Sequence, residues 1–175
     1  MLSRTTDGSA VNVPYTPSKA PGKHRLDPLN PGQGFLTPGW GNVTPFAITN
    51  FLATEPPELD SAQYTQDFND VKEKGSLNGS TRTPEETTIG LFWAYDGAQK
   101  IGVPPRLYNQ IVRVIAMQKG NTLAQNARLF ALVNMAMADA GIQCWHSKYY
   151  YNVWRPVVGV READPGWGPT GQGDG

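Results

Sequence analysis

Apolar residues recur at helical spacing through the middle of the chain, and no segment alternates in the manner of a β-strand. The spacing predicts helices over residues 60–74, 84–99, 105–120, 122–140 and 142–154. Short connections between such helices are typical of antiparallel neighbours. The predicted fold class is therefore all-α, an antiparallel bundle of about five helices.

Local signals set the ends of these helices. The segment Thr83-Pro84-Glu85-Glu86 combines a capping box with a proline at the first helical position, a strong helix start. Asp60 is the expected N-cap of the first helix. Gly141 is interpreted as the stop between the fourth and fifth helices, and Pro156 prevents the fifth from continuing.

Proline and glycine divide the chain into three parts. Residues 1–59 hold nine prolines and six glycines, which predicts an extended, loop-rich arm. Residues 60–158 form the predicted helical portion. Residues 159–175 are rich in glycine, and we expect this loop to lead to a missing C-terminal part. The arm also carries several aromatic side chains, which are scarce in disordered segments and favour wrapping around a larger body.

The overall charge narrows the classes of function. Fifteen basic and fifteen acidic side chains cancel, so bulk electrostatic binding to nucleic acid is not expected. No stretch approaches the roughly 18 consecutive apolar residues of a membrane-spanning helix. Cys144 is the single cysteine, which excludes an internal disulfide and a multi-cysteine zinc site. Because the charges of the whole chain cancel, an anion site must be formed by a local group of basic side chains.

The strongest candidate for such a site is the pair Lys148 and Arg155. On one continuous helix, seven residues fall about 20° short of two turns, so both cations would project from one face roughly 10 Å apart. Such long side chains could clasp one oxyanion, with Trp145, one turn earlier, as a wall of the pocket. The alternative is two solvated charges and an ordinary core tryptophan.

The same residues carry a family resemblance. The pattern Lys-x6-Arg-Pro over 148–156 resembles the first signature of the vanadium-dependent haloperoxidases, which share a helical fold and anion site with bacterial acid phosphatases and type 2 phosphatidic acid phosphatases. Further segments are similar to the chloroperoxidase branch, in order along the chain: residues 92–97, 104–110, 127–132, 139–141 and 154–156. The predicted bundle is thus a partial version of that fold.

The resemblance implies roles for particular residues. Lys148 and Arg155 match side chains that hold vanadate, or phosphate in the phosphatases. Trp145 matches a residue of the halide pocket, and Asp96 matches a carboxylate paired with a second arginine of the site. Hydrogen peroxide and halide would be the substrates. Without the resemblance, Asp96 would be interpreted as a helix-end or turn residue.

Two departures from the family pattern limit the prediction. The chain lacks both the Ser-Gly-His segment and the later Arg…His segment, which supply the family's imidazoles. Its two histidines are His24, far from the signature in sequence, and His146, about 200° around the helix from Lys148. We expect both to have a core or surface packing role. We therefore expect an N-terminal portion of the enzyme that is inactive alone, exposes apolar helix faces and requires a complementary C-terminal chain or domain.

Two other functions stay open on the sequence. The chain could be the corresponding part of an acid phosphatase-like phosphomonoesterase, with phosphate as the bound anion. It could also be a non-catalytic helical remnant that binds an anion or a partner. A homo-oligomer is compatible with either. Enzymes of the resembled family are often secreted or periplasmic.

Overall fold

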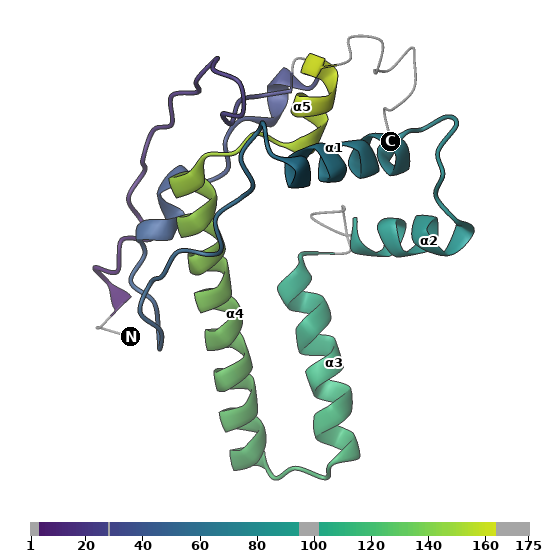
Figure 1. The fold of residues 1–175 in the computed structure, drawn as a ribbon. Coiled ribbons are helices and arrows are strands. Elements are labelled where there is room, and N and C mark those ends of the chain that lie inside the picture. The colour runs from purple at the N-terminus through teal and green to yellow at the C-terminus, as the bar shows by residue number, and fades with distance from the viewer. Residues whose placement is uncertain (1–3, 28, 95–101, 164–175) are drawn as a thin grey trace. The chain divides into compact units, whose positions relative to one another are not determined.

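The computed structural model of the chain describes residues 4–27, 29–94 and 102–163. These residues form five α-helices and no named strand (Figure 1). The helices are α1 (Ala62–Gly75), α2 (Pro84–Trp93), α3 (Pro104–Gln118), α4 (Leu123–Tyr151) and α5 (Pro156–Ala163), preceded by the short 3-10 helices η2 (Pro31–Gln33) and η3 (Pro38–Asn42). The predicted all-α class is confirmed.

The first three helices begin at or near their predicted positions. Thr83 caps α2 through the predicted capping box: its hydroxyl accepts from the Glu86 N–H at 3.1 Å, and the Glu86 carboxylate accepts from the Thr83 N–H at 2.8 Å. Ser61, and not Asp60, caps α1, with its hydroxyl 3.0 Å from the Tyr64 N–H. Helix α2 is described to Trp93, and most of the predicted remainder, residues 95–99, lies outside the described residues.

The predicted stop at Gly141 is wrong. Helix α4 runs through this glycine without interruption and is 29 residues long. A glycine inside a helix costs about 1 kcal/mol relative to alanine. The next residue, Ile142, is only 1% exposed, and burial of a side chain of this size stabilises by about 1.5–3 kcal/mol, enough to outweigh the glycine.

The helix predicted over residues 142–154 is not a separate element: most of it is the C-terminal part of α4. Helix α4 ends at Tyr151, because Asn152 adopts the left-handed conformation with φ 56°. Asparagine tolerates this conformation better than most residues. Pro156, interpreted from sequence as a stop, is the first residue of α5, a position that suits its fixed φ and missing N–H. Helix α5 itself was not predicted.

The chain forms two compact units. One comprises Met1–Thr44, Asn50–Arg82 and Ile142–Gly175, and the other comprises Pro45–Thr49 and Thr83–Gly141. Helix α4 contributes to both. The predicted three-part division follows proline and glycine content along the chain, whereas these units follow contacts in space. The three-part division therefore stays a prediction.

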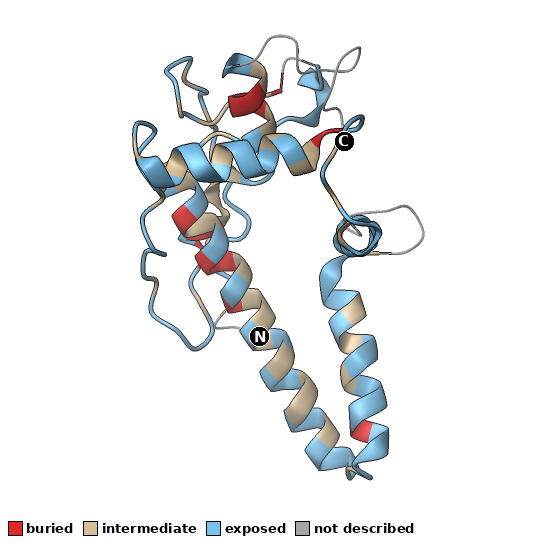
Figure 2. Cartoon of the chain, turned by 45° about the vertical axis from the view of Figure 1, so that its right-hand side comes forward, coloured by how far each residue is buried: buried red, intermediate tan, exposed pale blue. Residues whose placement is uncertain are grey.

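The first unit contains the largest fully buried side chains of the described residues. The fully buried side chains Ile142, Val158 and Val160 come from α4 and α5, and α5 also packs against α1. Figure 2 shows buried residues gathered in the C-terminal half of α4 and in α5. Polar side chains of α4 bind the irregular segment that precedes α1. Gln143 accepts from the Phe51 N–H at 3.0 Å, and Ser147 accepts from the Ala53 N–H at 3.0 Å.

The second unit pairs α3 with the N-terminal half of α4. Asn109 and Asn134 exchange two side-chain hydrogen bonds of 3.1 and 3.0 Å, and the buried Asp139 carboxylate accepts from the N–H groups of Phe46 and Ala47. Many large apolar side chains of this unit are exposed, as the sequence led us to expect for unpartnered helix faces. They include Ile89, Leu91, Phe92, Trp93, Ile111, Val114, Ile115, Met117 and Leu123.

Candidate anion site

Lys148 and Arg155 do not lie on one helix. Lys148 is in the last turn of α4, and Arg155 directly precedes α5, where its carbonyl accepts from the Val158 and Gly159 N–H groups at 2.9 and 3.2 Å. The predicted alignment over two helical turns is therefore wrong, because Asn152 ends α4 between them. Their relative position depends on the link formed by residues 152–154.

The arm holds this link in place. The His24 N–H donates to the Asn152 carbonyl at 2.9 Å, and the Trp154 N–H donates to the Gly22 carbonyl at 2.8 Å. Lys23 and Val153 form an antiparallel bridge between these bonds. The conformation of the link is thus set by residues about 130 positions earlier in the chain.

Tyr15 adds a side-chain anchor to the same link. Its hydroxyl lies 2.6 Å from the Asn152 Oδ1 and 2.8 Å from the His24 carbonyl oxygen. The Tyr15 hydroxyl is the donor, and its single proton is shared between these two acceptor oxygens. Asn152 is therefore hydrogen-bonded to the arm through both its backbone carbonyl and its side chain.

The charges of Lys148 and Arg155 act on the same imidazole. Burial lowers the pKa of His24, and the positive charges of Arg155 and then Lys148 lower it further. The two positive charges come from different elements and lower the pKa of this one imidazole in the same direction. Neither forms an ion pair with an acidic residue in the part of the chain that the structure describes.

Trp145 lies directly beside Lys148. The Lys148 Nζ is 4.3 Å from the centroid of the Trp145 ring, within the range of a cation–π interaction. The Trp145 indole N–H donates to the Leu36 carbonyl at 3.0 Å, and the residue is only partly buried. The structure thus brings Trp145 and Lys148 together as the sequence predicted. Asp96 lies outside the described residues.

His24 packs among aromatic side chains, as expected from the sequence. Its ring centroid lies 5.3 Å from that of Phe35, 5.7 Å from that of Tyr15 and 6.3 Å from that of Tyr149. Burial raises the pKa of Tyr149, and the Arg155 charge opposes that increase. The aromatic residues in the arm were the available signal, but they do not specify which part of the helical region the arm contacts.

A second set of charges anchors α5 to the arm. Arg161 forms an ion pair with the buried Asp27, and Arg25 pairs with Glu162 at 2.5 Å. Burial alone would raise the pKa of Asp27, but the hydrogen bonds that its carboxylate accepts, led by that of Arg161, lower it. These pairs fix the element that follows Arg155. Unlike Lys148 and Arg155, these two arginines are neutralised by carboxylates.

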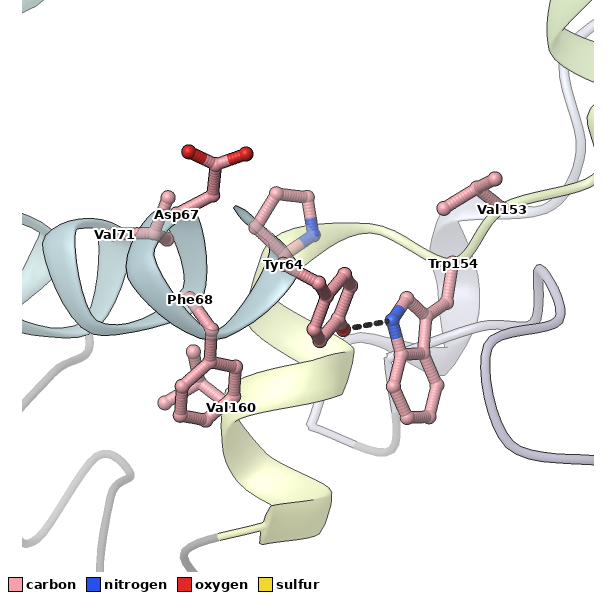
Figure 3. A pocket seen from close by; sticks show the side chains of 8 residues that line it. Tyr64, Asp67, Phe68, Val71, Val153, Trp154 and Val160 are labelled. Carbon is pink, nitrogen blue, oxygen red and sulfur yellow. Dashed lines mark hydrogen bonds between the residues drawn. The ribbon is translucent and has the colours of Figure 1, made fainter. Parts of the chain in front are cut away.

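An apolar pocket lies beside Trp154, separate in its chemistry from the two cations (Figure 3). It has a volume of about 120 Å³. The Trp154 indole N–H donates to the Tyr64 hydroxyl at 2.9 Å, and the carboxylate of Asp67 is the one charged group of the lining. Its lining residues are Tyr64, Asp67, Phe68, Val71, Val153, Trp154, Pro156 and Val160. With no cation among them, this pocket is unsuited to an oxyanion.

The residues that the structure describes contain no group of three or more His, Cys, Asp or Glu side chains arranged to hold a metal ion. None of their helices combines the length and the apolar composition needed to cross a membrane.

Comparisons with known proteins place these features in context. A family model described as the VCPO second helical-bundle domain matches residues 128–174. The vanadium chloroperoxidase of Curvularia inaequalis is 37% identical over 182 residues, an alignment that covers 90% of this chain and 29% of that protein. The chain therefore spans less than a third of the length of this curated relative.

The fold has a counterpart among solved structures. The crystal structure of a bacterial vanadium-dependent iodoperoxidase superposes with a TM-score of 0.69 and 23% sequence identity. The match covers 95% of this chain and 43% of that one. At this level of identity the match concerns the fold, and it includes nearly all of the chain.

Proposed function

Because this chain is related to the vanadium haloperoxidases in sequence and fold, we propose that it supplies part of a vanadate site in an enzyme that oxidises halide with hydrogen peroxide. The resemblance found in the sequence is confirmed by these relatives. The cofactor, the substrates and the site residues are our proposal for this chain. Lys148 and Arg155 are the residues that we assign to the anion.

The observation that carries the proposal is the concentration of unneutralised positive charge. Lys148 and Arg155 are exposed and have no acidic partner among the described residues, and both charges act on His24. Two such cations repel each other, and a bound oxyanion relieves that repulsion. Arginine offers a planar fork of donors and lysine a compact charge, a combination that suits a tetrahedral or trigonal oxyanion.

The residues present fit a vanadate anion in part. Lys148 and Arg155 would hold its oxygens by charge-assisted hydrogen bonds, and the cation–π contact with Trp145 would restrain the lysine ammonium. When bound, vanadate supplies the activation of peroxide toward halide. The chain's own contribution is preorganised positive charge directed at the oxygens. Trp145 keeps its proposed place in the halide pocket, and Asp96 its proposed pairing with a second arginine of the anion site.

The family's two imidazole-bearing segments are absent from these 175 residues. We therefore propose that halide oxidation requires further polypeptide, which would also cover the apolar side chains exposed on α2 and α3. The chain alone is expected to bind the anion weakly and to lack peroxidase activity. An oxidation assay with bromide or chloride, peroxide and vanadate tests this expectation, and turnover by the chain alone would contradict it.

A phosphatase-like function is the second candidate, because phosphate has the same charge requirements at Lys148 and Arg155. The relationship to a vanadium chloroperoxidase favours the first candidate. Hydrolysis of a phosphate ester, with no halide oxidation under any condition, would favour the phosphatase. A non-catalytic anion-binding role would leave both assays negative and vanadate binding intact even when the chain is joined to the further polypeptide that the first candidate requires.

Vanadate binding tests the site directly. Lys148→Ala and Arg155→Ala should each weaken binding, measured by calorimetry or by vanadium NMR. Lys19→Ala and Arg128→Ala serve as matched controls, because each removes an exposed cation of the same type for which the structure gives no partner. Equal affinity in all four variants would remove the site assignment.

A further inference from the structure

The backbone of His24 is held against residues 152–154, the link that lies between Lys148 and Arg155 in the chain. Its N–H donates to the Asn152 carbonyl at 2.9 Å, and the preceding residues pair with the same link. Gly22 permits this docking with φ 77°, and a Cβ atom at that position would lie 2.9 Å from the Leu59 side chain. The position of His24 is therefore fixed relative to the link that joins Lys148 to Arg155.

The surroundings of the His24 ring leave its nitrogens available. Phe35 packs against the ring edge-on, and the hydroxyls of its two tyrosine neighbours bond elsewhere: Tyr15 to the link and Tyr149 to the Leu36 carbonyl at 3.2 Å. No side chain or backbone group of the described residues hydrogen-bonds to the imidazole. A half-buried imidazole with open nitrogens needs water or a ligand as its partner.

We propose that His24 is a third side chain of the oxyanion site, where its neutral imidazole forms a hydrogen bond to an oxygen of the bound anion. This assignment rests on the proposed function. The neighbouring charges of Lys148 and Arg155 exclude a cation as the partner of the ring. An oxyanion attracted by those charges satisfies the imidazole as well, either as acceptor or through a protonated oxygen.

The electrostatics of the site support a neutral ring. Burial and the two cations lower the pKa of His24, so the imidazole is uncharged near neutral pH and acts as a hydrogen-bonding group. The charged or titratable groups around it are Arg155, Lys148, Tyr15 and Tyr149. A bound oxyanion would offset the two positive charges and so raise the pKa of His24.

The alternative is a purely packing role among aromatic rings, and His24→Phe separates the two. Phenylalanine keeps an aromatic ring in the cluster but cannot form the hydrogen bond. The proposal predicts roughly tenfold weaker vanadate binding, since a hydrogen bond to a charged group is at stake. His24→Gln, which keeps a polar side chain, should retain more affinity. His146→Phe is the matched control and should bind vanadate as the unmodified protein does.

Chemical modification gives a readout that packing alone would not change. Diethylpyrocarbonate acylates neutral imidazoles, and peptide mass spectrometry reports His24 and His146 separately. Vanadate should slow the modification of His24 severalfold and leave that of His146 unchanged. Equal rates at His24 with and without vanadate, together with unchanged affinity in His24→Phe, would overturn the proposal.

The outcomes distinguish this inference from the proposed function. If Lys148→Ala abolishes vanadate binding while both His24 variants bind normally, the anion site stands and His24 is not part of it. If the unmodified protein binds no vanadate, or if Lys148→Ala binds it equally well, the proposed function fails and the role of His24 fails with it. Circular dichroism of each variant checks that it is folded, so that a loss of affinity is not caused by unfolding.

Discussion

The left-handed residue Asn152 determines where Arg155 lies relative to Lys148, and its replacement tests that dependence. In Asn152→Ala, an alanine must adopt φ 56° at a cost of about 1 kcal/mol. The variant also loses the hydrogen bond to the Tyr15 hydroxyl, a further contribution of about 1 kcal/mol for a partly buried pair. The free energy of unfolding should therefore fall by about 2 kcal/mol.

Asn152→Gly separates the two contributions. Glycine adopts positive φ without steric cost, so this variant loses the Tyr15 bond but not the backbone conformation, and its unfolding free energy should fall by about 1 kcal/mol. The assay is urea unfolding followed by tryptophan fluorescence, with Asn78→Ala in the exposed loop as the control. Vanadate affinity should fall more in Asn152→Ala than in Asn152→Gly. Equal destabilisation by both substitutions would refute the reasoning.

Two further predictions concern stability. Gly41→Ala should lower the melting temperature by several degrees, because the new Cβ would lie 2.5 Å from the backbone of α4 at His146. An unchanged melting temperature would show that this contact is not tight. Stability should also fall on acidification. The folded pKa of His24 is lowered, so the unfolded chain takes up its proton first, and this loss begins as the pH falls through about 6.5. The folded pKa of Asp27 is lowered too, so its contribution is lost below about pH 4, and Asp27→Asn should remove that second phase in urea titrations across pH.

The parts of the fold that depend on local signals were predictable from the sequence. The capping box at Thr83 and the proline that starts α3 act within one helical turn, and the helices begin there or one residue away. Gly141 misled the prediction because its intrinsic cost is smaller than the stabilisation from burial of its neighbour Ile142, and burial is a tertiary property. The capping signal of α1 was displaced by one residue for the simpler reason that Asp60 and Ser61 are both good N-caps.

The candidate site was predictable in composition but not in geometry. The residues Lys148 and Arg155 were identified from their spacing and from the family resemblance, yet the continuous helix assumed between them is absent. The turn at Asn152 is stabilised by contacts from Tyr15 and His24, more than 120 residues earlier. The spacing of residues within the helical region does not reveal these contacts with the arm. The same separation explains why His24 was assigned to packing.

The central claim, that Lys148 and Arg155 together hold one oxyanion, is tested most directly by a double-mutant cycle on vanadate affinity. Each single substitution to alanine should weaken binding about tenfold or more, the range for a charge-assisted hydrogen bond. Because both side chains contact the same ligand, the double variant should deviate from the sum of the single effects by at least about 0.5 kcal/mol. Additive effects within error, or no effect of either substitution, would contradict the account.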